Sequence, residues 1–214
     1  IEGYQALWEL SQSNIHVIPV TGRPAGWCEM IARMWPVSAV VGENGGFYFR
    51  YHQKKMHRHF FFGQDEHLIV ENRKKLDVIR DEVLNQVPGT AVASDQFCRM
   101  MDLAIDFCED VPRLPSSAVQ KIVKIFEKHG AQAKVSSIHV NGWFGAYDKL
   151  TMAHRLLQKE FQISSAQSKE LAAFVGDSPN DEPMFEFFKN SFGVANIKDF
   201  ADQMKTLPAF VANS

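Results

Sequence analysis

The segment that most constrains the fold of this chain is an apolar run at 171–175 that breaks at Gly176. The run reads as a buried strand, and the loop after it carries Asp177, Asn180 and Asp181. In an α/β sheet, ligands bind at the carboxyl ends of the strands. Two carboxylates with an amide between them suit a hard divalent cation beside a phosphate. The alternative is an ordinary helix N-terminus with an acidic first turn.

The N-terminal residues predict the same kind of sheet. Helical patterns at 2–13 and 26–34 alternate with apolar runs at 15–20 and 37–41 that read as strands, the first of them buried. Helix and strand alternating at this spacing favour right-handed crossovers and a parallel sheet. The first strand ends at the tripeptide 21–23, and the second ends at a glycine-rich stretch.

The tripeptide after the first strand is suited to phosphate. The hydroxyl of Thr21 and the backbone N–H groups at Gly22 can hold a phosphate oxygen. Arg23 adds a forked donor that matches phosphate geometry. The alternative is a plain strand-to-helix turn. In the glycine-rich stretch 42–46, Asn44 reads either as part of the same site or as part of a hairpin turn.

From residue 47 the pattern changes to that of an antiparallel sheet with two helices. The expected strands and helices lie at 47–51, 56–62, 65–86, 99–108, 116–129 and 134–144. The first two flank a polar turn and predict a β-hairpin. Residues 99–108 and 134–144 alternate between apolar and polar side chains, as half-buried strands do. An antiparallel sheet covered by helices on one face leaves its other face open.

That open face is a candidate ligand surface. Alternation along the strands places on it Asp102, Asp106, His139, Asn141 and Trp143. An aromatic, a histidine and an asparagine on one face favour a surface that binds a ligand, and the alternative is an ordinary solvated strand face. Glycines near both ends of the segment permit hinge motion, so we expect the segment to act as a mobile lid.

After the inserted segment the parallel pattern returns. Asp148 is placed to cap a helix at 149–161. Lys149, in the first turn, opposes the helix dipole by roughly a few tenths of a kcal/mol. Its position makes sense if the lysine and the helix end share an anion, and the alternative is a solvated surface lysine. Further strands are expected at 192–195 and, at the sheet edge, at 209–212.

In their order and spacing, these motifs resemble those of the haloacid dehalogenase-like hydrolase superfamily. The features are the tripeptide 21–23 after a strand, an inserted domain, Lys149 at a helix start, and the carboxylate loop. The resemblance is to the branch with a type C2B α/β cap, which includes mannosyl-3-phosphoglycerate, sucrose-phosphate and trehalose-phosphate phosphatases and the phosphomannomutases. It implies an α/β fold with a Rossmann-like parallel three-layer core at 1–46 and 145–214, and an inserted α+β cap domain at 47–144.

The resemblance also implies roles for individual residues. Thr21 would bind the transferring phosphoryl group, and Lys149 would neutralise it. Asp177 would ligate Mg²⁺ directly, while Asp181 would support the metal through water or hold Lys149. Asn180 would orient the site. Together with the residues argued above, the candidate substrate contacts are Gly22, Arg23, Asn44, Asp102, His139, Asn141 and Asn180.

The reaction that the resemblance implies is Mg²⁺-dependent hydrolysis of a phosphate monoester. An aspartate attacks in line, and water hydrolyses the resulting aspartyl-phosphate. The family's Asp-x-Asp motif is absent from this sequence, which begins with the helix that should follow it. We therefore expect the nucleophile to lie upstream of residue 1 and the 214-residue chain alone to be inactive. The alternatives are a hexose phosphomutase of the same fold and a non-catalytic protein that binds a phosphometabolite.

The composition excludes several other classes of protein. A formal net charge of −2 over 214 residues offers no basic surface for nucleic acid. The apolar runs fall short of the ~18 residues of a membrane span. The three cysteines are scattered, as in proteins of a reducing compartment. The sequence thus predicts a cytoplasmic protein, a monomer or weak homodimer, whose partner is a small phosphorylated substrate and most simply a sugar phosphate.

Overall fold

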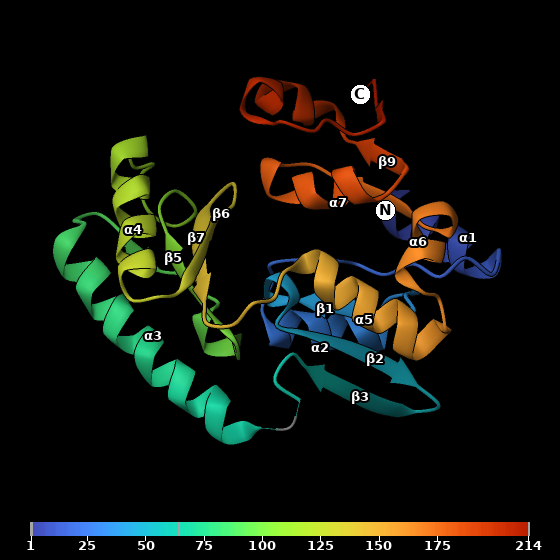
Figure 1. Ribbon diagram of the computed structural model, residues 1–214, viewed down its shortest axis with the longest axis horizontal. Helices are drawn as coiled ribbons and strands as arrows, with labels where there is room; N and C mark the ends of the chain where they lie inside the picture. The colour runs from blue at the N-terminus through green and yellow to red at the C-terminus, as the bar shows by residue number, and fades with distance from the viewer. Residues whose placement is uncertain (1, 64, 214) are drawn as a thin grey trace. The chain divides into compact units, whose positions relative to one another are not determined.

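The computed structural model describes residues 2–63 and 65–213, which form two compact units, 1–152 and 153–214. The helices and 3-10 turns of the first unit are α1 (Glu2–Gln12), α2 (Ala25–Met34), η1 (Glu43–Gly45), α3 (Glu66–Gln86), η2 (Gln96–Cys98) and α4 (Ser116–Lys128) (Figure 1). Helix α5 (Lys149–Phe161) begins in the first unit and ends in the second. These α-helices lie within one residue of the predicted ranges. No helix in the described part of the chain has the length and apolar character that crossing a membrane requires.

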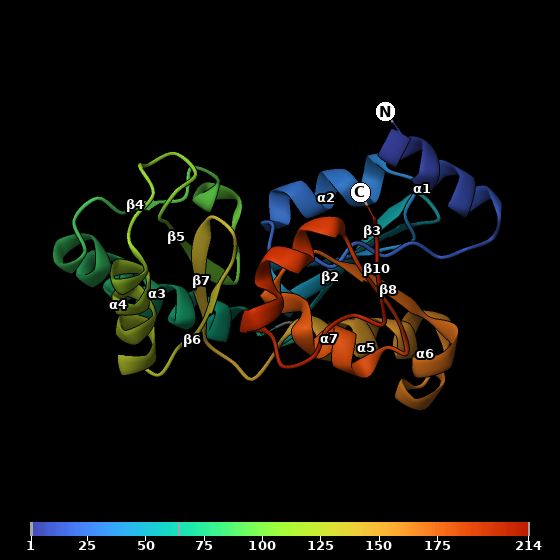
Figure 2. The same cartoon turned by 90° about the horizontal axis from the view of Figure 1, so that it is seen from above.

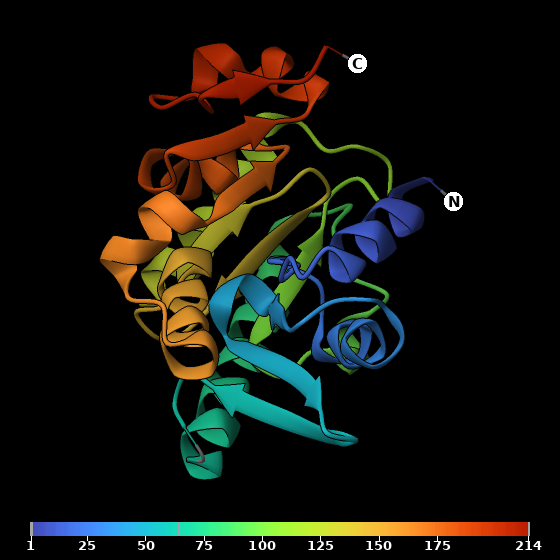
Figure 3. The same ribbon diagram turned by 90° about the vertical axis from the view of Figure 1, so that its right-hand side faces the viewer.

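The first unit contains an antiparallel sheet built around the predicted hairpin. Its strands, in spatial order, are β1 (Val40–Gly42), β2 (Phe47–His52) and β3 (Lys55–Phe60). Gln53 and Lys54 form the turn with positive φ angles of 49° and 61°, as a two-residue hairpin turn requires. Phe47 and Phe49 are buried against α2, where each contributes roughly 2–3 kcal/mol by leaving water. The hairpin is visible in cyan and teal in Figure 3. Strand β2 pairs with β1, so hydrogen bonds run across the predicted domain boundary at residue 47. The boundary itself stays a prediction.

The segment 15–20 is extended, but the prediction that it forms a buried strand is wrong. Its pairing with β1 is limited to a single parallel bridge, between Val20 and Val41. Ile15 is 50% exposed, and residues 17–20 are only partly buried. Pro19 has no N–H to donate. The interstrand hydrogen bonds of this segment within the described chain all go to residues 38–41. A segment that hydrogen-bonds to a neighbouring strand along one edge only does not become a buried central strand.

A second antiparallel sheet follows, and we call it the inserted sheet. Its strands, in spatial order, are β4 (Ala91–Val92), β5 (Asp102–Asp106), β7 (His139–Trp143) and β6 (Gln132–Val135). Helices α3 and α4 lie against one face of it, as Figures 1 and 2 show from two directions. The buried contacts between them include Ile79, Ile105 and Phe126. This arrangement confirms an antiparallel sheet with two helices over residues 91–143, but the hairpin at 47–60, which was predicted to belong to the same segment, lies in the other sheet with β1.

The other face of the inserted sheet is buried, which corrects the prediction of an open polar face. The register does place the five predicted side chains together, since Asp102 pairs with Trp143 and Asp106 with His139. However, Asp102, Asp106, His139, Asn141 and Trp143 are each at most 4% exposed.

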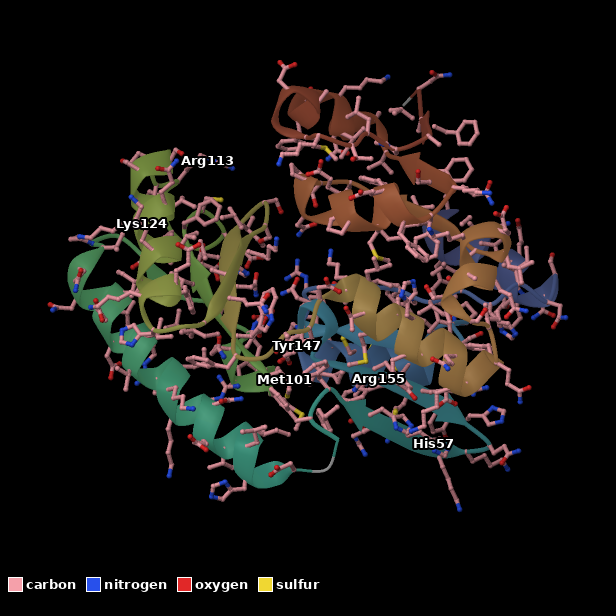
Figure 4. The ribbon with its side chains drawn as sticks, viewed as in Figure 1. His57, Met101, Arg113, Lys124, Tyr147 and Arg155 are labelled. Carbon is pink, nitrogen blue, oxygen red and sulfur yellow. The ribbon has the colours of Figure 1, made fainter. Side chains whose placement is uncertain are left out.

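The cover over this face comes from other segments of the same unit. Trp143 belongs to a buried cluster that includes Phe47, Met101 and Tyr147. Figure 4 labels Met101 and Tyr147. Polar side chains on this face therefore have protein rather than water as their surroundings.

The second unit contains a parallel sheet with short helices. Its strands, in spatial order, are β10 (Phe210–Val211), β9 (Asn190–Gly193) and β8 (Ala173–Gly176). Its helices and 3-10 turns, besides the end of α5, are α6 (Ser165–Leu171), η3 (Pro179–Asp181), α7 (Glu182–Phe187) and η4 (Ala195–Gln203). The parallel strands and the edge position of β10 confirm the prediction. Helix α6 was missed, although Ser164 and Gln167 form a capping box at its start.

Strand β8 differs from the predicted buried strand. Phe174 stacks on Phe188 and contacts Phe185 edge-on, whereas Val175 is 63% exposed. Successive side chains of a strand point to opposite faces. An apolar run therefore predicts which side chains favour burial but does not establish that both faces are covered.

We predict that Gly142→Ala destabilises the inserted sheet. A Cβ atom at Gly142 would lie 2.1 Å from a ring carbon of the buried Phe126, so strand β7 or helix α4 has to shift. Overpacking of this kind costs about 1–3 kcal/mol. The measurement is the free energy of unfolding from urea titration. Gly3→Ala, the same change in a helix with nothing within 4 Å, is the control and should not destabilise. Equal stability of Gly142→Ala and the unmodified protein would contradict the prediction.

Candidate active site

The predicted phosphate-binding turn is held by backbone hydrogen bonds. The N–H of Thr21 donates to the carbonyl of Val41 at 3.0 Å, and the N–H of Asn44 donates to the carbonyl of Thr21 at 3.2 Å. The hydroxyl oxygen of Thr21 accepts from the N–H of Arg23 at 3.1 Å. This bond leaves the hydroxyl hydrogen to donate elsewhere. The turn is therefore fixed against the end of β1 with its hydroxyl oriented.

Arg23 is held by acidic side chains of the loops beside the inserted sheet. Its Nη1 lies 3.8 Å from Asp95 and 3.9 Å from Glu109, and its guanidinium lies over the ring of Trp27. The Arg23 side chain is 38% exposed. Partly exposed pairs at such distances contribute about 0–1 kcal/mol. An anionic ligand can therefore replace these partners at little cost.

The residues after β1 adopt a rare backbone conformation. Glu43 and Asn44 have positive φ angles of 42° and 56°, which non-glycine residues adopt at a cost of ~1 kcal/mol or more. The Asn44 side chain packs against Gly22, where an added Cβ would lie 3.1 Å from its amide oxygen. Its amide nitrogen is 3.5 Å from Asp102. Asn44 thus lies beside the tripeptide turn, as predicted, but it is buried.

Glu43 is a site residue that sequence reasoning missed. Its side chain is completely buried and accepts N–H groups from Ala25 at 2.8 Å, from Met100 at 2.9 Å and from Asp102 at 3.1 Å. Met101 donates to it as well. Burial and the nearby Asp102 carboxylate raise the pKa of Glu43 to about 7. The only sequence signal is its place in the glycine-rich stretch, and a glutamate in a loop is usually exposed.

Asp102 and Asn141 belong to the same buried network. Asp102 accepts from Arg99 Nη1 at 3.0 and 3.1 Å and from the Asn141 amide at 3.1 Å. Arg99 is a second residue that sequence reasoning missed. Its Nη1 also donates to the carbonyl of Gly22 at 2.9 Å. The structure thus brings Gly22, Asn44, Asp102 and Asn141 together.

His139 lies on the same sheet face but has different neighbours. Its Nε2 is 2.9 Å from a carboxylate oxygen of Glu109, without the alignment of a hydrogen bond. Burial lowers the pKa of His139, and the Glu109 carboxylate opposes that shift only in part. Burial opposes ionisation of Asp106 too, but three backbone N–H groups outweigh it and lower the pKa of that carboxyl. Because Glu109 also neighbours Arg23, His139 is linked to the turn through one carboxylate.

Lys149 is the first residue of α5, as predicted. The carboxylate of Asp148 accepts from the N–H of Thr151 at 2.7 Å, which confirms the predicted cap. Gly45 has a φ angle of 104°, and an added Cβ there would lie 2.1 Å from the Asp148 carbonyl and 3.1 Å from the Lys149 nitrogen. The glycine-rich turn after β1 therefore packs against the backbone where α5 begins.

The carboxylate loop of the second unit has the predicted strand-end geometry. Asp177 follows β8 and is exposed, whereas Asp181 is 4% exposed. The Asp181 carboxylate accepts from the N–H of Asp177 at 3.2 Å. Ser178 donates to the amide oxygen of Asn180 at 2.8 Å. Asp181 therefore fixes the backbone that carries Asp177, and Asp177 is left at the surface.

The carboxylate loop matches a Mg²⁺ site in chemistry. Among the described residues, no three His, Cys, Asp or Glu side chains are grouped to hold a metal. Mg²⁺ is usually held by one or two carboxylates together with water and substrate phosphate. Asp177 and Asp181 offer that donor type. Of the two, Asp177 is the one whose carboxylate lies at the surface, while Asp181 holds the Asp177 backbone.

We predict that Glu43 makes stability fall as pH rises. A carboxyl whose pKa in the folded protein is about 7, above an ordinary value of 4.5, adds stability below pH 4.5 that is lost as pH rises through 7. The fall is on the order of 3 kcal/mol. Glu43→Gln should have a lower free energy of unfolding at every pH, because the amide NH₂ of glutamine would face backbone N–H donors. The variant should not show the decrease in stability with rising pH. Unfolding free energies between pH 4.5 and 7.5 measure it, with the exposed Glu127→Gln as control. Parallel curves for the Glu43 variant and the unmodified protein would refute the assignment.

Comparison with known proteins identifies the fold. No protein-family model and no curated protein sequence matches the chain. Among solved structures, a Thermoplasma acidophilum protein matches with a TM-score of 0.72 at 17% identity, over 99% of this chain and 82% of that one.

Two further matches carry informative descriptions. The sucrose-phosphatase of Synechocystis matches with a TM-score of 0.62 at 16% identity, over 100% of this chain and 84% of that one. A haloacid dehalogenase-like hydrolase of Bacteroides thetaiotaomicron matches with a TM-score of 0.63 at 12% identity, over 98% and 85%. The chain therefore has the fold of the haloacid dehalogenase-like hydrolases, a Rossmann-like core with an inserted cap domain.

Proposed function

We propose that this protein is a Mg²⁺-dependent phosphatase of small phosphorylated metabolites, with sugar phosphates as its class of substrate. The observation that carries the proposal is the loop after β8. There, the Asp177 carboxylate is exposed at the end of a parallel strand. The buried Asp181 carboxylate accepts a hydrogen bond from the backbone N–H of Asp177. Strand ends of this kind are where α/β folds bind ligands. The hydrolase fold supports the same class of reaction.

The first unit supplies groups for the phosphoryl oxygens. In this proposal, the hydroxyl of Thr21 donates to one oxygen, and Arg23 exchanges its weak acidic partners for the phosphate. Lys149 adds a positive charge at the start of α5. Phosphoryl transfer depends on neutralising and aligning such oxygens, and these three side chains are of the required types.

The loop after β8 would supply the metal ligand. Asp177 would bind Mg²⁺ directly, Asp181 would hold the Asp177 backbone, and Asn180 would help to orient the loop. Bound Mg²⁺ would neutralise phosphoryl charge. In this proposal a carboxylate attacks the phosphorus in line and displaces the alcohol of the substrate, and water then hydrolyses the acyl phosphate to free phosphate. None of the residues assigned here is that nucleophile, so the experiments below measure binding rather than turnover.

The sugar-phosphate assignment rests on the polar inner face of the inserted sheet and on the fold comparison. The Synechocystis structure was determined in complex with sucrose and phosphate, which supports a related substrate for this fold. In this protein Asp102, His139 and Asn141 are buried. We therefore assign to His139 the positioning of the exposed Glu109, and to Asp102 and Asn141 the support of Arg99, rather than direct contact with a sugar.

We predict that Asp177→Asn weakens Mg²⁺ binding. Replacing the exposed carboxylate by an amide removes the charge that a hard cation needs, so affinity should fall at least ~10-fold. Isothermal titration with MgCl₂ in the presence of inorganic phosphate measures it. Asp199→Asn, the same change at an exposed aspartate of the same unit, is the control. Unchanged Mg²⁺ affinity in Asp177→Asn would remove the basis of the proposed function.

We also predict that Thr21→Val weakens phosphate binding. Valine keeps the shape of threonine but neither accepts the Arg23 N–H nor donates to a ligand, so inorganic phosphate should bind about tenfold less tightly. Phosphate titration followed by ³¹P NMR gives the affinity. Thr151→Val, at an exposed position of α5, should bind phosphate as the unmodified protein does. Equal affinities of Thr21→Val and Thr151→Val would assign Thr21 to an ordinary turn.

A further inference from the structure

Arg99 links the inserted sheet to the phosphate-binding turn through buried hydrogen bonds. It lies in the loop before β5, and its side chain is only 1% exposed. Nη1 donates to the Gly22 carbonyl at 2.9 Å and to Asp102 at 3.0 and 3.1 Å, while Nε donates to Asp95 at 3.2 Å. One guanidinium therefore holds a backbone carbonyl of the turn and two carboxylates of the inserted domain.

The same loop contacts the turn a second time through Asp95. One oxygen of the Asp95 carboxylate accepts from Arg99, and the other lies 3.8 Å from Arg23. Asn44 completes the link from the other side, because its side chain lies near both Asp102 and Gly22. The turn is thus in contact with one buried polar network on both sides.

Because the Gly22–Arg23 peptide group is planar, the hydrogen bond from Arg99 also determines how the Thr21 hydroxyl is oriented. The carbonyl of Gly22 and the N–H of Arg23 belong to the same planar peptide group, so fixing one fixes the direction of the other. Arg99 holds the carbonyl, and the N–H then points at the hydroxyl oxygen of Thr21, 3.1 Å away. Glycine imposes little restriction of its own on this peptide. The orientation must therefore be set from outside the turn.

We infer that Arg99 is a positioning residue for the phosphate-binding turn: it sets the Gly22–Arg23 peptide and thereby the Thr21 hydroxyl. The inserted domain then contributes to phosphate binding without touching the ligand. Order in the loop before β5 and order in the turn become coupled. The part of this inference that concerns phosphate rests on the proposed function, whereas the ordering of the turn does not.

Hydrogen–deuterium exchange of the full chain tests the ordering. The main variant is Arg99→Lys, which keeps a positive charge beside Asp102 but lacks the fork that reaches Gly22. Amide exchange at 21–23 and at Asn44 should rise about tenfold or more, the effect of losing one charged hydrogen bond. Exchange in α4 should stay the same. Unchanged exchange at 21–23 in Arg99→Lys would overturn the inference.

Arg73→Lys is the matched control. Arg73 donates to the backbone carbonyls of Arg99 at 2.8 Å and of Asp102 at 3.1 Å, so it supports the same loop without contacting the turn. Its variant should raise exchange at 99–104 and leave 21–23 protected. Equal loss of protection at 21–23 in both variants would show general loosening and overturn the inference.

A charge-balanced variant keeps the test decisive if Arg99→Lys does not fold. Arg99→Met combined with Asp102→Asn removes both charges of the buried pair. It should show the same rise in exchange at 21–23. Protection at 21–23 equal to that of the unmodified protein would overturn the inference.

Titration with inorganic phosphate, followed by ³¹P NMR, tests the part of the inference that concerns phosphate binding. Arg99→Lys should weaken phosphate binding about tenfold, while Arg73→Lys should bind as the unmodified protein does. Equal affinity in Arg99→Lys, together with raised exchange, would overturn the positioning role while leaving the proposed function intact. Absence of phosphate binding in the unmodified protein would overturn the proposed function, and the exchange result would still decide whether Arg99 orders the turn.

Discussion

The buried carboxylate of Glu43 is the constraint on which the first unit depends. Moving a charged or polar group out of water costs several kcal/mol unless hydrogen bonds replace the lost hydration. Here the replacements are backbone N–H groups from the start of α2 and from the residues that open β5. These segments are far apart in sequence, so the glutamate is satisfied only when the helix, the turn and the inserted sheet are all in place. The left-handed backbone at Glu43 and Asn44 is the local cost of directing the side chain inward.

The close packing around the turn also gives a structural reason for Gly45 and Gly46. Glycines at the ends of the inserted segment suggest hinges when only the sequence is known. In the structure, Gly45 lies against the carbonyl of Asp148, and an added Cβ at Gly46 would lie 2.8 Å from Met101. A Cβ atom has no room at either position, because Gly45 faces a backbone and Gly46 faces a side chain. Buried polar contacts such as Arg99 with Asp102 fix one geometry more strictly than apolar packing does, because an unpaired partner is costly. The inserted sheet is therefore joined to the turn by directional bonds.

The sequence predicts those features that depend on local periodicity. The long helices, the hairpin and the shared face of Asp102, His139 and Asn141 follow from repeats of 3.6 or 2 residues. The burial of that face does not follow, because part of its cover, including Asn44 and Phe47, comes from residues distant in sequence. Glu43 and Arg99 were missed for a similar reason, since each is a charged loop residue that hydrogen-bonds a segment distant in sequence. The exposed Val175 shows the opposite error: an apolar side chain favours burial, but only tertiary structure provides a cover.

The two arginines near the tripeptide turn, Arg23 and Arg99, differ in burial and in the strength of their contacts. Arg99 is buried and makes short, aligned bonds, so removing any partner leaves a costly unpaired group. Arg23 is partly exposed, and its acidic neighbours lie 3.8 and 3.9 Å away, in water that weakens such pairs. A phosphate dianion competes for Arg23 at little cost, whereas it cannot compete for Arg99 without dismantling the network. Burial therefore separates the two side chains: one guanidinium fixes the turn, and the other would be available to an anion under the proposed function.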